Sequence, residues 1–328
     1  MLSLFRTNQL VANALLIFYI LLLRFSSFIV PLELHPGQAG LLGENLLSIV
    51  PPEGTLSAVL SIILIFLQAL LINVISARYR IARSVSLFPG VFYVLLCSCF
   101  SDFLYLSPVL MANTFLILAL YELLGSYKKY YSNGRIYNAG LWIGVTTLFY
   151  FSSIIFLGAV FMGFVILRAF KLKEQIGLLL GFITPFWLAG IYYFVNDNLS
   201  DFWLRSFGNI GFFDFSISNS WVSYVQVGTF VVFILVAIFS YRTYTYRVSI
   251  QAQKFVDVFF WVLAFSLGTL LVQSNLQADH LLFLAVPLSF MIGMTFLYMN
   301  KRLAEAVHFL FLAGILLLQF KPFWFVAG

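Results

Sequence analysis

Asp102 is the acidic residue whose surroundings most favour a chemical role. It is the only charged residue between Ser84 and Tyr121. A carboxylate held among apolar side chains can accept a proton from a reacting group. The structural alternative is that Asp102 caps a helix or marks the tip of a tight outer hairpin. Both interpretations predict two helices joined at Asp102.

Four further residues in polar segments are candidates for a site. Glu33 and His35 lie in PLELHPG, Glu44 lies in GLLGENLLSIV, and His280 ends QADH. Glu33 and Glu44 are candidate catalytic carboxylates, and the two histidines are candidate substrate-binding groups. The structural alternatives are a solvated loop for Glu33 and His35, and an ordinary helix start for His280 and the preceding aspartate.

Arg24 and Arg205 are candidates for holding an anionic substrate. A guanidinium group binds phosphate through two parallel hydrogen bonds. The structural alternative for Arg205 is an anchor at the membrane interface. Both arginines therefore enter the candidate site as substrate-binding residues.

The sequence predicts no metal site and no cofactor. Its only cysteines, Cys97 and Cys99, are spaced so that they point to different sides of a helix. No ligand spacing typical of a metal site occurs, and neither a phosphate-binding loop nor a dinucleotide-binding glycine motif is present. We therefore do not expect the nucleotide-dependent chemistry that is typical of soluble enzymes.

The elements that must position these residues are membrane helices. The chain is 62% hydrophobic and only 9% charged, with a mean hydropathy of +1.01, whereas soluble domains carry about 25% charged residues. Its apolar runs are continuous, which favours helices over a barrel. We predict an all-α polytopic membrane protein with about eleven transmembrane helices, since one span needs roughly 20 residues. The predicted spans are 10–30, 55–76, 87–101, 108–124, 137–151, 153–167, 175–195, 219–240, 255–273, 280–299 and 303–320.

The basic residues predict a cytoplasmic N-terminus. This topology puts fifteen of the eighteen basic and four of the twelve acidic residues on the inner side, a balance of +11, and leaves −5 outside. Such a bias follows the positive-inside rule. The basic excess indicates an anionic lipid surface as partner and gives no reason to expect nucleic acid.

One uncharged stretch decides the number of helices. AGLWIGVTTLFYFSSIIFLGAVFMGFVIL runs for 29 residues, which as one helix would be about 44 Å long. We therefore predict two short buried helices within 137–167, turning near Ser152 and Ser153. Such a turn is tolerated only where neighbouring helices shield it from lipid.

The order of these elements resembles a known superfamily. A first helix leads to an outer loop with carboxylates and an interface helix, then come two helices joined at SDFLYLSP, and then the short hairpin of the uncharged stretch. This resembles the N-terminal module of the GT-C type membrane glycosyltransferases, which use polyprenyl-phosphate sugars. The resemblance covers residues 1–195 and rests on hydropathy and order. The chain also looks similar to an uncharacterised family of bacterial integral membrane proteins.

The GT-C resemblance implies sugar transfer from a polyprenyl-phosphate donor on the outer face of a bacterial inner membrane. By position, Glu33 or Glu44 would match the catalytic base of the first outer loop, and Asp102 the second acidic residue of that superfamily. We expect one transmembrane domain over 1–328, in which 196–328 adds an outer capping loop and four helices. The alternative is a non-catalytic scaffold or accessory subunit of an envelope assembly or secretion system, bound to other membrane proteins. The two differ in whether Glu33, Asp102 and Arg205 converge on one outer cavity.

Overall fold

The computed structural model describes most of the chain. Glu33 and His35 lie outside the residues that it describes. The described residues are 2–6, 10–29, 39–52, 54–129, 132–168, 171–207, 221–246, 248–272 and 278–320.

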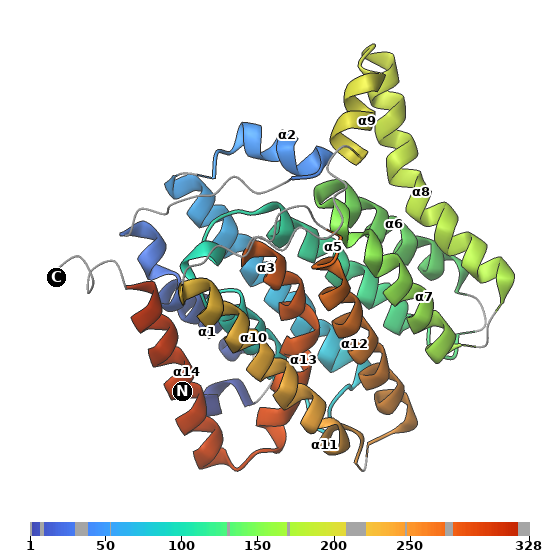
Figure 1. Ribbon diagram of the computed structural model, residues 1–328. Helices are drawn as coiled ribbons and strands as arrows, with labels where there is room; N and C mark the ends of the chain where they lie inside the picture. The colour runs from blue at the N-terminus through green and yellow to red at the C-terminus, as the bar shows by residue number, and fades with distance from the viewer. Residues whose placement is uncertain are drawn as a thin grey trace.

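The described part of the chain is built from helices and contains no strand (Figure 1). The elements in order are η1 (Leu2–Arg6), α1 (Leu10–Leu23), η2 (Phe25–Phe28), α2 (Leu41–Ile49), α3 (Thr55–Tyr79), α4 (Phe88–Leu96), η3 (Ser101–Phe103), α5 (Pro108–Gly125), α6 (Asn133–Phe149), η4 (Phe151–Ile155), α7 (Phe156–Leu167), α8 (Leu172–Val195), α9 (Leu199–Phe207), α10 (Trp221–Phe239), α11 (Tyr241–Thr245), α12 (Ile250–Thr269), η5 (Ala278–Leu281), α13 (Leu282–Tyr298) and α14 (Lys301–Gln319).

Six helical segments of the described chain are long and apolar enough to cross a membrane: α3, α5, α8, α12, η5 with α13, and α14. Shorter apolar helices lie at Ala12–Leu23, Phe151–Leu167 and Tyr224–Phe239. The prediction of a helical protein is therefore confirmed for the described residues, which include helices long and apolar enough to cross a membrane. The count of eleven spans and the cytoplasmic N-terminus remain predictions.

The core is formed around α4 and α13. Every residue of α4 is buried, and in α13 only Thr295 and Tyr298 are not. Because these side chains are covered on all sides, other helices enclose both α4 and α13. Gly293 of α13 lies against the backbone of Pro89 in α4, and the Gly90 amide donates to Asn73 Oδ1 of α3 at 2.8 Å. These close approaches hold three helices together at the centre.

The uncharged stretch forms two helices, as predicted. Helix α6 ends at Phe149, the backbone is extended at Tyr150, and the short η4 leads into α7. Ser152 and Ser153 are buried, and the Ser152 hydroxyl donates to the carbonyl of Val272 at 3.1 Å. The turn between the helices is thus covered by the segment that follows α12.

Helix α8 packs on α6 through glycines and then leaves the bundle. A β-carbon at Gly140 would overlap the carbonyl oxygen of Leu178, and one at Gly181 would overlap that of Tyr137. Small residues allow such close backbone contact between membrane helices. Beyond this contact α8 projects away from the other helices and carries α9 at its far end (Figure 1).

Candidate functional site

Asp102 lies in η3, which contacts η5 at the start of α13. Its carboxylate is half-buried. Asp102 Oδ2 accepts a hydrogen bond of 2.5 Å from the side-chain amide of Gln226 in α10, and Gln226 is buried. Ser101 makes a longer contact to the other carboxylate oxygen, at 3.4 Å. Asp102 therefore joins the loop after α4 to a helix from the C-terminal half.

A second carboxylate, Asp279, reaches the same region from η5. It is only 5% exposed and accepts a hydrogen bond from the hydroxyl of Tyr105, three residues after Asp102. Burial raises the pKa of Tyr105 above its ordinary range, and the Asp279 and Asp102 carboxylates raise it further. Both carboxylates thus act electrostatically on one phenol.

His280 completes this group of side chains. It is 2% exposed, and its ring lies 5.2 Å from the ring of Tyr150, tilted by 55°. Tyr150 is the cap residue between α6 and η4. We call Asp102, Tyr105, Asp279 and His280 the acidic cluster. Its two carboxylates and its phenol are groups that can take up, hold or pass on a proton.

Arg24 binds the backbone of the residue that follows Asp102. It directly follows α1 and is fully buried. One guanidinium nitrogen donates to Ser61 Oγ at 3.1 Å, and another donates to the carbonyl oxygen of Phe103. No ion pair between Arg24 and a carboxylate occurs among the described residues. Arg24 therefore uses its donors to hold the residue that follows Asp102.

Arg205 and Glu44 meet each other and make no described contact with Asp102. The Arg205 guanidinium in α9 lies 3.7 Å from Glu44 of α2 and 3.9 Å from Asp201. The Arg205 and Glu44 side chains are 42% and 38% exposed. An exposed, loose ion pair contributes little to stability. It connects α9 to α2, and its guanidinium is accessible to another anion.

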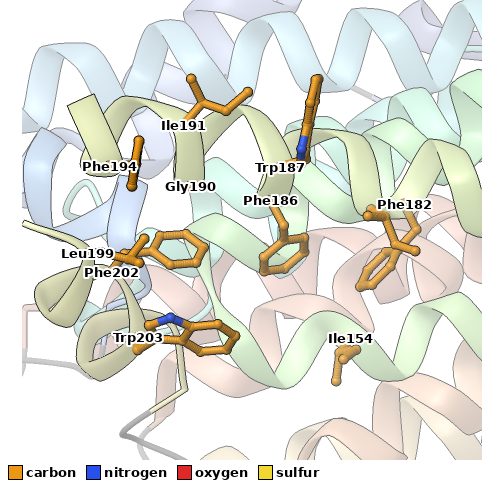
Figure 2. A pocket seen from close by; sticks show the side chains of 11 residues that line it. Ile154, Phe182, Phe186, Trp187, Gly190, Ile191, Phe194, Leu199, Phe202 and Trp203 are labelled. Atoms are coloured by element: carbon orange, nitrogen blue, oxygen red, sulfur yellow. The ribbon is translucent and has the colours of Figure 1, made fainter.

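An apolar groove lies between α8 and α9 (Figure 2). It has a volume of about 560 Å³ and is lined by the C-terminal half of α8, by α9 and by Ile154 of η4. Figure 2 shows the rings of Phe182 and Phe186 on α8 and of Phe202 and Trp203 on α9 around one apolar space. The segment from Tyr150 to Ile154 therefore contacts His280 at one end and the groove at the other.

The model of a family of unknown function, DUF6427, matches residues 10–324. The chain belongs to this family. No curated protein and no solved structure matches the chain. Membership of the DUF6427 family assigns no activity, so the argument for a function rests on the site.

For this DUF6427 member, the structure brings together Asp102 and His280 among the sequence-predicted site residues. Glu44 and Arg205 form a separate pair, Arg24 is enclosed beneath η3, and Glu33 and His35 lie outside the described residues. Within the part of the chain that the structure describes, no group of three histidine, cysteine, aspartate or glutamate residues could hold a metal ion.

Sequence reasoning missed the roles of Tyr105, Gln226 and Asp279. Asp279 is not among the predicted site residues, although its position beside His280 was a usable signal. Tyr105 stands three residues after Asp102, which places it in the same short loop. Nothing in the sequence around Gln226 distinguishes it, because its importance comes from a contact with a residue 124 positions away.

Proposed function

We propose that this protein is a membrane glycosyltransferase that transfers a sugar from a polyprenyl-phosphate donor to an acceptor hydroxyl at the acidic cluster. The observation that carries the proposal is the placement of two carboxylates, Asp102 and Asp279, around Tyr105, in a cluster that the segment from Tyr150 to Ile154 connects to an apolar groove. A reaction of this kind needs a base that deprotonates the acceptor hydroxyl and an apolar site that holds the isoprenoid chain of the donor.

Asp102 is the base in this proposal. It removes the proton of the acceptor hydroxyl while the acceptor oxygen forms a bond to the anomeric carbon of the sugar. The bond between that carbon and the lipid-phosphate oxygen breaks, and the leaving phosphate keeps the electron pair. The Gln226 amide orients Asp102 through its hydrogen bond, and Tyr105 with Asp279 forms the opposite polar side.

The groove between α8 and α9 accommodates the isoprenoid chain of the donor. Its lining is aromatic and aliphatic, as expected for a site that receives a hydrocarbon chain. Arg205 lies two residues after Trp203, on the same short helix, and its pairing with Glu44 is loose. In the proposal, the donor phosphate replaces Glu44 as the partner of this guanidinium.

The proposed location is a bacterial inner membrane, with the acidic cluster outside and the N-terminus in the cytoplasm. The basic residues favour this orientation because they gather at the opposite ends of the helices. A lipid-linked sugar that has reached the outer leaflet is then available at the groove.

The test is complementation of a deletion strain, scored with the profile of lipid-linked sugars. We expect Asp102→Asn and Asp279→Asn to abolish function at normal membrane abundance and to cause a lipid-linked sugar to accumulate. The matched control is Asp257→Asn, which changes a carboxylate near the other end of the bundle that is bonded to Tyr241. Full function in both acidic-cluster variants would overturn the enzyme proposal.

A non-catalytic scaffold is the second candidate. It is favoured by the projection of α8 and α9 from the bundle (Figure 1) and by the pairing of Arg205 with Glu44 rather than with Asp102. A scaffold would tolerate both acidic-cluster variants and would co-purify with other membrane proteins. Loss of function through Trp203→Glu, with the acidic-cluster variants active, would support this alternative.

A further inference from the structure

Five basic residues from four segments surround the turn that ends α5. Lys128 and Lys129 belong to this turn, Arg168 follows α7, Lys171 precedes α8, and Lys254 lies in the first turns of α12. We call these five residues the basic junction. They lie at the opposite ends of the helices from the acidic cluster, since α12 and α6 both run from this side towards it.

Arg168 fixes the framework of the basic junction. Its guanidinium binds both carboxylate oxygens of Glu174, at 3.1 and 2.8 Å. It also donates to the carbonyls of Ser126 and Lys129, at 3.0 and 2.5 Å. Cations at the C-terminal end of a helix are favourable because the terminal carbonyls lack partners there. This geometry ties α5, α7 and α8 together and neutralises the one carboxylate with an ion pair in the junction.

The remaining cations are in excess of acidic partners. Lys254 donates to the carbonyl of Ile166 at 2.9 Å, and its ammonium lies 5.8 Å from the ring centre of Tyr127. Lys128 lies 5.5 Å from the same ring. Lys171 is 57% exposed and reaches Glu174 only at 4.0 Å. An anion that binds at the basic junction therefore meets three or four positive charges that acidic side chains do not neutralise.

The backbone at Lys128 directs its side chain towards Tyr127. Lys128 has a φ of 54°, in the left-handed region in which many helices end, and Arg80 and Asp197 share this conformation. At Lys128 the ammonium lies 5.5 Å from the centre of the Tyr127 ring.

An apolar surface continues from the basic junction along the membrane-facing sides of α7 and α8. Val165 of α7 and Leu172, Ile176 and Leu179 of α8 are exposed large hydrophobic residues. A phosphate at the junction would thus lie above a surface that acyl chains can cover. Tyrosine is also the residue expected at the level of lipid headgroups.

We propose that the basic junction binds the phosphate of an anionic glycerophospholipid, such as phosphatidylglycerol or cardiolipin, with the acyl chains along α7 and α8. The charge excess selects an anionic over a zwitterionic headgroup. Cardiolipin has two phosphates and can therefore pair with more of these cations than phosphatidylglycerol can. The site lies at the other end of the bundle from the acidic cluster and does not depend on the proposed sugar transfer.

The test is native mass spectrometry of the full chain in a neutral detergent, titrated with cardiolipin or phosphatidylcholine. The variant combines Lys128→Gln, Lys129→Gln and Lys171→Gln. We expect it to bind cardiolipin about tenfold or more weakly than the wild type, with phosphatidylcholine binding unchanged. The control combines Arg242→Gln, Lys301→Gln and Arg302→Gln, which removes equal charge from exposed positions at α11 and α14.

The outcomes separate a site from a general electrostatic attraction. Equal loss in the control, or cardiolipin retention by the junction variant, would overturn the proposal. Displacement of cardiolipin by inorganic phosphate alone would also overturn it, because the acyl chains would then contribute nothing. Should the triple variant lose its fold in circular dichroism, Lys171→Gln alone replaces it. This exposed residue is expected to give a loss of a few-fold, and an unchanged affinity would count against the site.

Discussion

The Gln226 side-chain amide donates a 2.5 Å hydrogen bond to Asp102 across 124 residues of sequence. This bond joins α10, which is largely exposed along its length, to the loop between α4 and α5. This hydrogen bond fixes the direction of the Asp102 carboxylate.

Asp102→Asn tests the role of the negative charge. The substitution keeps the size of the side chain and removes the proposed base, so we expect the proposed transferase activity to fall by about 10² to 10⁴. Turnover of a lipid-linked sugar by purified protein measures this change. Gln226→Leu removes only the orienting donor, and we expect a smaller loss. Equal losses for both would contradict a catalytic role for the Asp102 carboxylate.

Tyr105→Phe tests the buried contact with Asp279. It leaves a carboxylate that is 5% exposed without this donor, and we expect the free energy of unfolding to fall by about 1 to 3 kcal/mol. Thermal unfolding in detergent, followed by circular dichroism, measures it. In a double-mutant cycle with Asp279→Asn, the two losses should not add. Strictly additive losses would mean that the two side chains do not interact.

Arg24→Gln tests the support of η3. Losing the donor to the Phe103 carbonyl should cost about 1 to 3 kcal/mol and displace the neighbouring Asp102. We therefore expect lower stability together with lower activity. Arg6→Gln is the matched control, because Arg6 also donates to a backbone carbonyl, that of Leu297 at 3.1 Å, but far from Asp102. A control that loses equal activity would rule out a specific effect on η3.

Gly181→Leu tests the contact between α6 and α8. The new side chain would collide with the backbone at Tyr137, so we expect a loss of about 1 to 3 kcal/mol or more. Gly177→Leu is the control on the same helix, because nothing lies within 4 Å of a β-carbon built there. Thermal stability and yield in the membrane compare the two. A similar effect at both positions would show that helix propensity, rather than packing, is responsible.

Local patterns in the sequence predicted the helices, including the short helix α2, and the turn at Ser152 and Ser153. Long apolar runs have few alternatives in a membrane, and an uncharged run of 29 residues has to bend. Helix boundaries were less accurate. Helix α12 begins at Ile250, five residues before the predicted start, because Ser249 caps it by accepting from the amide of Ala252. The predicted capping loop contains α9.

The partners of the site residues could not be predicted. Asp279 and Tyr105 are 174 positions apart, and no local pattern specifies such a pairing. Arg24 was expected near the outer side as a phosphate ligand, yet its guanidinium is fully buried and bonded to Ser61. The packing of the helices decides that Arg24 is buried and that Arg205 is accessible. This packing could not be derived from a single sequence.

The shortness of α4 has a consequence for access to Asp102. Nine residues make a helix of about 14 Å, less than half of the roughly 30 Å of hydrocarbon in a bilayer. Helix α4 is therefore too short to cross a bilayer by itself. In the proposed membrane orientation, the loop that carries Asp102 would lie below the level of the surrounding headgroups. A reactant tethered to a lipid would meet this carboxylate by lateral diffusion within its own leaflet, whereas a reactant dissolved in water would have to descend to it.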